Sequence, residues 1–222
     1  MTRKTLWRLI KAFLVSALGV YLLLRAPYLY AQIKYIFSSH EETPVHVSGP
    51  AVITPVLLPV SKMSKAVVKK PQPLPAQAKL IISKIGVNVP IVFGIDGNDF
   101  KAMYDRLNQG VVHYAATPKP GQNGTAMIIG HSSDYIWKKN PYASVFALLN
   151  KLNPGDVITV QYGDGSSYRF VVKQAVIYDP KNDDPAKFTS LENTPTPSLL
   201  LITCWPVNST SKRYMVQAIL ES

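Results

Sequence analysis

The sequence predicts a mainly β protein: a closed or nearly closed β-barrel of seven or eight strands with short inserted helices, preceded by an N-terminal transmembrane helix and a Pro-rich linker. Three observations predict this architecture. Residues 1–36 combine basic side chains with a long apolar run, residues 37–78 are rich in proline, and residues 79–222 hold short apolar runs between turn residues. Since 47% of the 222 residues are hydrophobic, the chain can bury a core and is not disordered overall.

The segment 1–36 is predicted to be a cytoplasmic basic tail and a transmembrane anchor. It contains six Lys or Arg and no acid, and its uncharged run from Ala12 to Leu24 is 13 residues long. A spanning helix needs about 20 residues, which the apolar residues before Ala12 supply if Arg8 and Lys11 extend to the lipid head groups. The positive-inside rule then predicts a single-pass protein of the cell membrane with a cytoplasmic N-terminus and an extracellular folded domain. A cleaved signal peptide and a buried core helix remain as alternatives.

The segment 37–78 is predicted to be a linker, and 79–222 the folded domain. Seven prolines fall between residues 44 and 75, a composition that excludes helix and interior strand and favours a semi-extended spacer. The net charge of +11 belongs mostly to residues before the folded domain, which has fourteen basic against eleven acidic residues. Binding to nucleic acid is therefore not expected. The single cysteine excludes an intrachain disulfide and a multi-cysteine metal site.

Short apolar runs bounded by turn residues predict the strands of the folded domain. The runs are 79–94, 110–114, 125–130, 156–162, 167–178, 199–203 and 213–220. Two helices are expected between them, one over 99–107 capped by Asn98 and one over 142–152 opened by Asn140-Pro141. With so many strands in 144 residues, closure into a barrel would remove the exposed strand edges.

Cys204 ends a run of four aliphatic residues and a threonine, where Trp205-Pro206 prevents the strand from continuing regularly. The run 213–220 alternates as a strand should, and if the two strands are antiparallel neighbours, Cys204 and Arg213 face each other across the ladder. A guanidinium beside a thiolate favours the ionised form of the thiol. The plainer interpretation is a buried structural cysteine and a solvated arginine.

His131 follows the run TAMIIG in the sequence Gly-His-Ser-Ser, so it also stands at the end of a strand. A thiol acyl transferase needs a thiolate that attacks a carbonyl, an imidazole that moves the proton, and a cation that stabilises the developing oxyanion. Cys204, His131 and Arg213 supply these three residue types. A lone histidine in such a place is otherwise an ordinary loop residue.

These residues resemble the sortases, the membrane-anchored cysteine transpeptidases of Gram-positive-type cell surfaces. The cysteine strand of that family reads T-L-x-T-C, which the residues from Leu201 to Cys204 match, with Leu200 where the first Thr is usual. The family's histidine follows a hydrophobic strand, as His131 does in IIGHSS. Its arginine opens the strand after the cysteine loop, as Arg213 does.

The resemblance extends from about Lys79 to Leu220, and the stretches TCWP and KRYMVQA are most similar to class D. It implies an eight-stranded closed sortase-type β-barrel that recognises a C-terminal LPxTG-like sorting motif on secreted proteins. Cys204 would form a thioester with the threonine of the motif, and an amine of a cell-wall precursor or a pilin would resolve it.

The resemblance also implies roles for single residues. His131 would be the acid and base, and Arg213, together with Thr203, would bind the substrate and support the oxyanion. His113 lies in a segment that the family does not use for proton transfer, so we expect a structural role for it.

No cofactor is expected. Asp179, Asp183 and Asp184 offer oxygen ligands of the kind that some sortases use for calcium, but with Lys181 and Lys187 nearby we expect these carboxylates to be solvated. The non-enzymatic alternative is a membrane-tethered β-barrel binding module with an inert cysteine. A papain-like enzyme or an L,D-transpeptidase would carry its own cysteine signature, which this sequence lacks.

Overall fold

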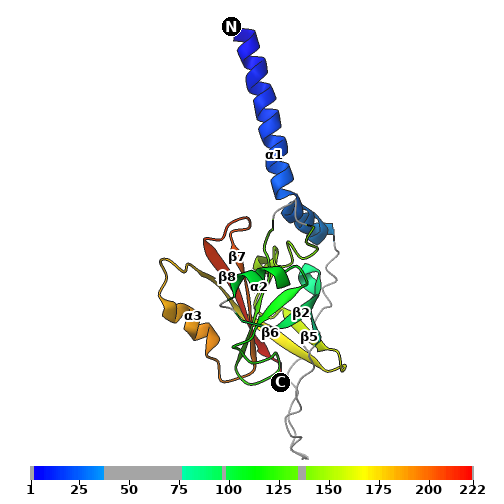
Figure 1. The fold of residues 1–222 in the computed structure, drawn as a ribbon, viewed down its shortest axis with the longest axis vertical. Helices are drawn as coiled ribbons and strands as arrows, with labels where there is room; N and C mark the ends of the chain where they lie inside the picture. The colour runs from blue at the N-terminus through cyan, green and yellow to red at the C-terminus, as the bar shows by residue number, and fades with distance from the viewer. Residues whose placement is uncertain (1–2, 38–76, 97–98, 135–138, 222) are drawn as a thin grey trace, which may run out of the picture.

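The computed structural model describes residues 3–37, 77–96, 99–134 and 139–221 (Figure 1). Helix α1, Arg3–Phe37, opens the described chain, and its part Arg3–Leu23 is long and apolar enough to cross a membrane. Among the described residues this is the one helix long and apolar enough to cross a membrane, and it fits a single-pass membrane anchor. Most of the predicted linker, residues 38–76, lies outside the described residues, as does Asn98, the predicted helix cap.

Eight strands lie in the described part of residues 77–221. They are β1 (Ala78–Ile82), β2 (Val87–Ile95), β3 (Val111–Tyr114), β4 (Thr125–Ile129), β5 (Val157–Tyr162), β6 (Ser167–Tyr178), β7 (Ser198–Trp205) and β8 (Lys212–Leu220). The single predicted run 79–94 is two strands, because the short 3₁₀ turn η1 (Ser83–Ile85) and Gly86, with a φ of 67°, reverse the chain between β1 and β2.

The strands close into a barrel (Figure 1), in the order β1-β2-β3-β4-β7-β8-β6-β5, with β5 paired to β1. Neighbouring strands are antiparallel except for two parallel pairs, β2 with β3 and β4 with β7. A closed barrel exposes no unpaired strand edge. The predicted fold class is therefore confirmed.

Strand β7 is buried on both faces up to Thr203, and strand β8 is buried in its middle part. Leu199 and Leu201 point into the barrel core, whereas Leu200 and Ile202 belong to a second apolar cluster on the outer face. Leu199, Leu200 and Leu201 have no exposed surface. This agrees with the prediction that a run of four aliphatic residues is buried on both sides.

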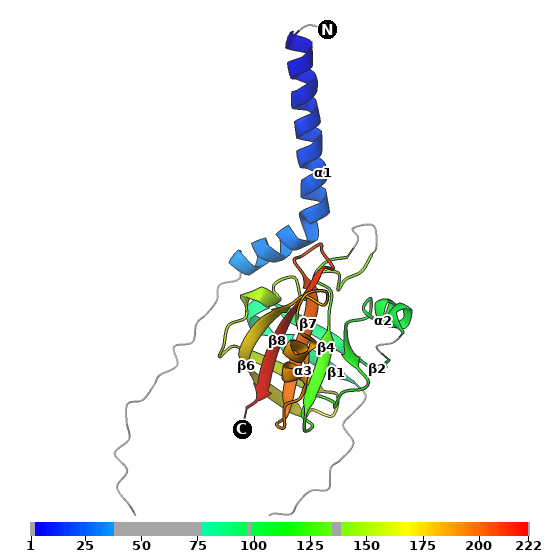
Figure 2. The same ribbon diagram turned by 90° about the vertical axis from the view of Figure 1, so that its left-hand side faces the viewer.

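Helix α3, Pro185–Glu192, covers the outer face of these strands and was not predicted (Figure 2). Its Leu191 is buried in the outer cluster, and Phe188 packs against that cluster. Two local features begin the helix: the side chain of Asp184 accepts a hydrogen bond from the backbone N–H of Ala186, and Pro185 occupies the first turn.

Helix α2, Phe100–Arg106, lies outside the barrel beside β2 (Figure 2). Its position agrees with the prediction, but the predicted cap Asn98 is wrong: the N-cap is Asp99, whose side chain accepts a hydrogen bond of 2.8 Å from Ala102 N–H.

The prediction of a helix over 142–152 is wrong. The structure has successive turns there and only the short 3₁₀ turn η2, Leu149–Lys151. The physical reason is that the backbone N–H of Phe146 donates to the carbonyl of His131 at 2.8 Å, which removes it from an α-helical ladder. Asn140 accepts a hydrogen bond from Tyr142 N–H and thereby forms a turn.

Candidate active site

Cys204 lies near the end of β7, and its partner across the antiparallel ladder is Arg213 of β8. The predicted register of these two strands is therefore confirmed. The thiol is free and partly exposed. Alternation along β7 puts Cys204 on the same face as Leu200 and Ile202, so it stands above the outer apolar cluster and not in the barrel core.

His131 comes level with Cys204 through a different pairing. Strands β4 and β7 are parallel, and Ile129 is the register partner of Ile202. The backbone N–H of Gly130 continues the ladder by donating to the carbonyl of Ile202 at 3.1 Å. If this register is continued for two residues beyond the last pair, His131 comes level with Cys204.

Gly130 is required by the packing around it. A Cβ at this position would lie 2.5 Å from the ring of Phe146, a distance that real contacts do not show. The backbone N–H of Phe146 also donates to the carbonyl of His131. The segment that contains Phe146 therefore packs back on the end of β4 and fixes the backbone of Gly130 and His131.

Comparison with known proteins places the chain in a family. A family model described as the sortase domain matches residues 80–221, which is more than half of the chain. The chain belongs to the sortase family.

Individual relatives agree with this assignment. Sortase D of Bacillus subtilis is 28% identical over 150 residues, and the match covers 66% of this chain and 65% of that protein. The chain thus spans just under two thirds of that relative's length. Sortase C-1 from Actinomyces oris has a similar structure, with 27% identity, a TM-score of 0.53, and coverage of 65% of this chain and 73% of that one. A sortase D5 transpeptidase of Clostridium perfringens is also similar in structure. Its sequence identity is 25%, its TM-score is 0.50, and the match covers 66% of this chain and 79% of that one.

The guanidinium of Arg213 in this sortase is held by backbone carbonyls at the start of β8 and in the loop before it. One of its terminal nitrogens, Nη1, donates to the carbonyls of Thr210 at 2.8 Å and Lys212 at 2.9 Å. A guanidinium carries five N–H donors, so these bonds use only part of its capacity. The neighbouring Lys212 forms an ion pair of 3.8 Å with Asp179, at the end of β6, as expected for a side chain on the opposite face of the strand.

Thr203 is buried, with 2% of its surface exposed, and its hydroxyl donates to the carbonyl of Gly130 at 2.8 Å. The expected contact with substrate stays a prediction. In the structure the side chain joins the strand that carries the cysteine to the residue before His131. The sequence pointed to Thr203 as a site residue, but the hydrogen bond of its hydroxyl with Gly130 was not predicted.

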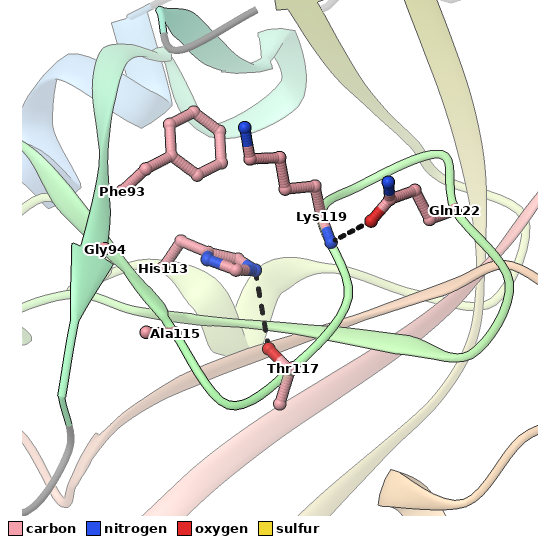
Figure 3. A pocket seen from close by; sticks show the side chains of 7 residues that line it. All are labelled: Phe93, Gly94, His113, Ala115, Thr117, Lys119 and Gln122. Atoms are coloured by element: carbon pink, nitrogen blue, oxygen red, sulfur yellow. Dashed lines mark hydrogen bonds between the residues drawn. The ribbon is translucent and has the colours of Figure 1, made fainter. Parts of the chain in front are cut away.

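His113 occupies β3 and is buried, with 3% of its surface exposed. Its Nε2 lies 2.9 Å from the carbonyl of Pro118, and since a carbonyl only accepts, Nε2 carries the proton. Its ring lies against Phe93 beside a surface hollow whose rim includes Lys119 (Figure 3). Burial lowers the pKa of His113, so this histidine is kept neutral. These surroundings fit the structural role expected from the sequence.

The three aspartates considered for calcium have partners within their own loop. Asp184 caps α3, Asp183 accepts from the backbone N–H of Asp179 and from Lys187, and Asp179 accepts from Asn182. Hydrogen bonds, first from Asn182 and Lys181, lower the pKa of Asp179 and favour the carboxylate. Among the residues that the structure describes, no group of three or more His, Cys, Asp or Glu is arranged to hold a metal ion.

A further connection joins the cysteine loop to the histidine loop and was not predicted. The backbone N–H of Asn208, which has a φ of 67°, donates to the hydroxyl of Ser133 at 3.0 Å. A left-handed backbone is more common for Asn than for other residues with a side chain, but this preference does not predict the contact with Ser133.

Proposed function

We propose that the chain is a membrane-anchored sortase that cleaves a C-terminal LPxTG-like sorting motif and transfers the protein to an amine. The observation that carries the proposal is that β4, β7 and β8 are neighbours in the barrel and bring their candidate site residues to the same end of it. Register pairing sets Arg213 opposite Cys204, and the parallel pairing of β4 with β7 brings His131 level with the same cysteine. The residue types of a nucleophile, a proton carrier and a cation therefore lie at the same end of three adjacent strands.

In the proposed reaction the thiolate of Cys204 attacks the carbonyl carbon of the threonine in the motif. Arg213 stabilises the negative charge that develops on the carbonyl oxygen. His131 donates a proton to the departing nitrogen of the glycine, so that the C–N bond breaks and a thioester remains. An incoming amine then loses a proton to His131, attacks the thioester, and releases the thiolate.

The substrates and location that we propose follow from family membership and from α1. Sortases act on secreted proteins with sorting motifs and on amine nucleophiles, here from a cell-wall precursor or a pilin. The match to Sortase D supports a class D assignment. We place residues 1–36 as the cytoplasmic tail and anchor, 37–78 as the linker, and 79–222 as the extracellular catalytic domain.

The test is to incubate the full chain in detergent with a panel of fluorogenic sorting peptides, with and without amine acceptors and calcium. We expect cleavage between threonine and glycine and a product that carries the added amine. If no peptide is cleaved and iodoacetamide modifies Cys204 no faster than a buried thiol, the proposal fails in favour of a tethered binding module with an inert cysteine.

A further inference from the structure

Tyr104 of α2 meets the imidazole of His131 at the candidate active site. The two ring centroids are 5.4 Å apart and the ring planes are inclined by 74°, which is an edge-to-face pair. This geometry is the favoured one for aromatic pairs. The contact joins a helix that follows β2 to a histidine that follows β4, so the two residues are remote in sequence.

The hydroxyl of Tyr104 is fixed from the other side. It donates to Oδ1 of Asp134 at 2.6 Å, and Oδ2 of the same carboxylate accepts from the side-chain amide of Asn140 at 3.2 Å. Asn140 in turn accepts from the backbone N–H of Tyr142 at 2.8 Å. The tyrosine ring is therefore tied to the loop that begins at His131.

His131 needs such support because it lies beyond the last residue of β4, where the strand ladder no longer holds it. The backbone of the histidine is fixed by Phe146 N–H, which leaves the rotation of its side chain to be restrained by neighbouring groups. The contact between Tyr104 and the imidazole is the edge-to-face contact of the tyrosine ring.

We propose that Tyr104 is a positioning residue that holds the imidazole of His131 in place for proton transfer, with Asp134 fixing the tyrosine ring. This inference rests on the proposed function, since it assigns proton transfer to His131. Proton transfer by a positioned side chain depends on its geometry relative to the reacting atoms. A restraint of this kind acts on the chemical step and leaves the affinity for the peptide unchanged.

The kinetic test compares Tyr104→Ala and Tyr104→Phe with wild type in the full chain. Tyr104→Ala should lower kcat about tenfold with KM within about twofold. Tyr104→Phe keeps the ring and should recover kcat to within about threefold of wild type. The matched control is Phe100→Ala, because Phe100 lies on the same short helix with 74% of its surface exposed and should leave kcat unchanged.

A spectroscopic test does not depend on activity. In protein labelled with ¹³C at its four histidines, removal of the Tyr104 ring should shift the imidazole signals of His131, identified by their loss in His131→Asn. The signals of His113 should not move in Tyr104→Ala, but should move in Phe93→Ala, because Phe93 packs on that ring at 5.2 Å.

The role of Asp134 is tested by a double-mutant cycle. If Tyr104 and Asp134 act through their shared hydrogen bond, Tyr104→Phe combined with Asp134→Ala should lose no more activity than the more damaging single change. Losses that multiply would overturn the part assigned to Asp134.

The positioning role of Tyr104 is overturned if Tyr104→Ala keeps its kcat, if it raises KM alone, or if the His131 signals do not move. These failures differ from failure of the proposed function, in which wild-type protein forms no thioester at all. In that event the histidine spectra still report whether Tyr104 holds His131. Melting temperatures of all variants separate both results from unfolding.

Discussion

His113 and His131 follow similar apolar runs on neighbouring strands, β3 and β4, and the structure surrounds them differently. His113 is buried, its Nε2 is bound to the carbonyl of Pro118, and burial lowers its pKa. His131 stands past the end of β4, level with Cys204 and in contact with the ring of Tyr104. The difference arises from the neighbouring strand, because of β3 and β4 only β4 is paired with β7, the strand that carries the cysteine.

The largest effect that separates the two histidines is expected on turnover. His131→Ala should lower kcat/KM by on the order of 10³, within the range for loss of a general acid and base. His113→Ala should leave turnover of the folded fraction within about threefold and lower the melting temperature, since a buried hydrogen-bonded ring is removed. The measurement is kcat/KM on a cleaved sorting peptide, scaled by the folded fraction of each variant. Equal losses at equal stability would show that His131 is not the distinct base.

A smaller loss is expected at Arg213, on the other neighbour of the cysteine strand. Arg213→Lys keeps the charge but loses the planar fork of donors, so kcat/KM should fall by on the order of 10², the scale of one oxyanion donor. Lys212→Ala is the matched control, because that side chain pairs with Asp179 on the opposite face. A larger loss at Lys212 than at Arg213 would contradict the roles assigned to the two sides of β8.

The smallest effect concerns the bond between Thr203 and Gly130. Thr203→Val keeps the shape of the side chain but leaves the buried carbonyl of Gly130 without its donor, so we expect kcat to fall about tenfold and KM to stay unchanged. Thr203→Ser should restore most of the activity. A rise in KM with unchanged kcat would instead support the substrate contact expected from the sequence, and steady-state kinetics distinguish the two results.

The sequence was sufficient to predict features that depend on the pattern of residues within single strands. Four aliphatic residues before Cys204 predicted a strand buried on both faces, and alternation after Arg213 predicted the register that the structure shows. The barrel followed from the number and spacing of such runs. These features depend on local periodicity, which a single sequence reports directly.

Other features depend on contacts between segments remote in sequence, and these were missed. The segment 142–152 has a helical pattern, but Phe146 N–H bonds to His131 and its ring packs on Gly130, so tertiary contacts override the local preference. Helix α3 carries only two apolar residues that pack on the barrel, too few to give a period. Its start at Asp184-Pro185 was readable, but the aspartates were interpreted only as loop residues.

The central claim is that Cys204 forms a covalent thioester with the sorting peptide. The most direct measurement is the intact mass of the full chain after incubation with a cleaved sorting peptide in the absence of an amine, followed by mapping of the modified residue. The account predicts an added mass equal to the peptide without its glycine-led fragment, located on Cys204 and removed by hydroxylamine. The adduct should be absent in Cys204→Ala, whose melting temperature should be unchanged. Peptide turnover that persists in Cys204→Ala, or an adduct on another residue, would contradict it.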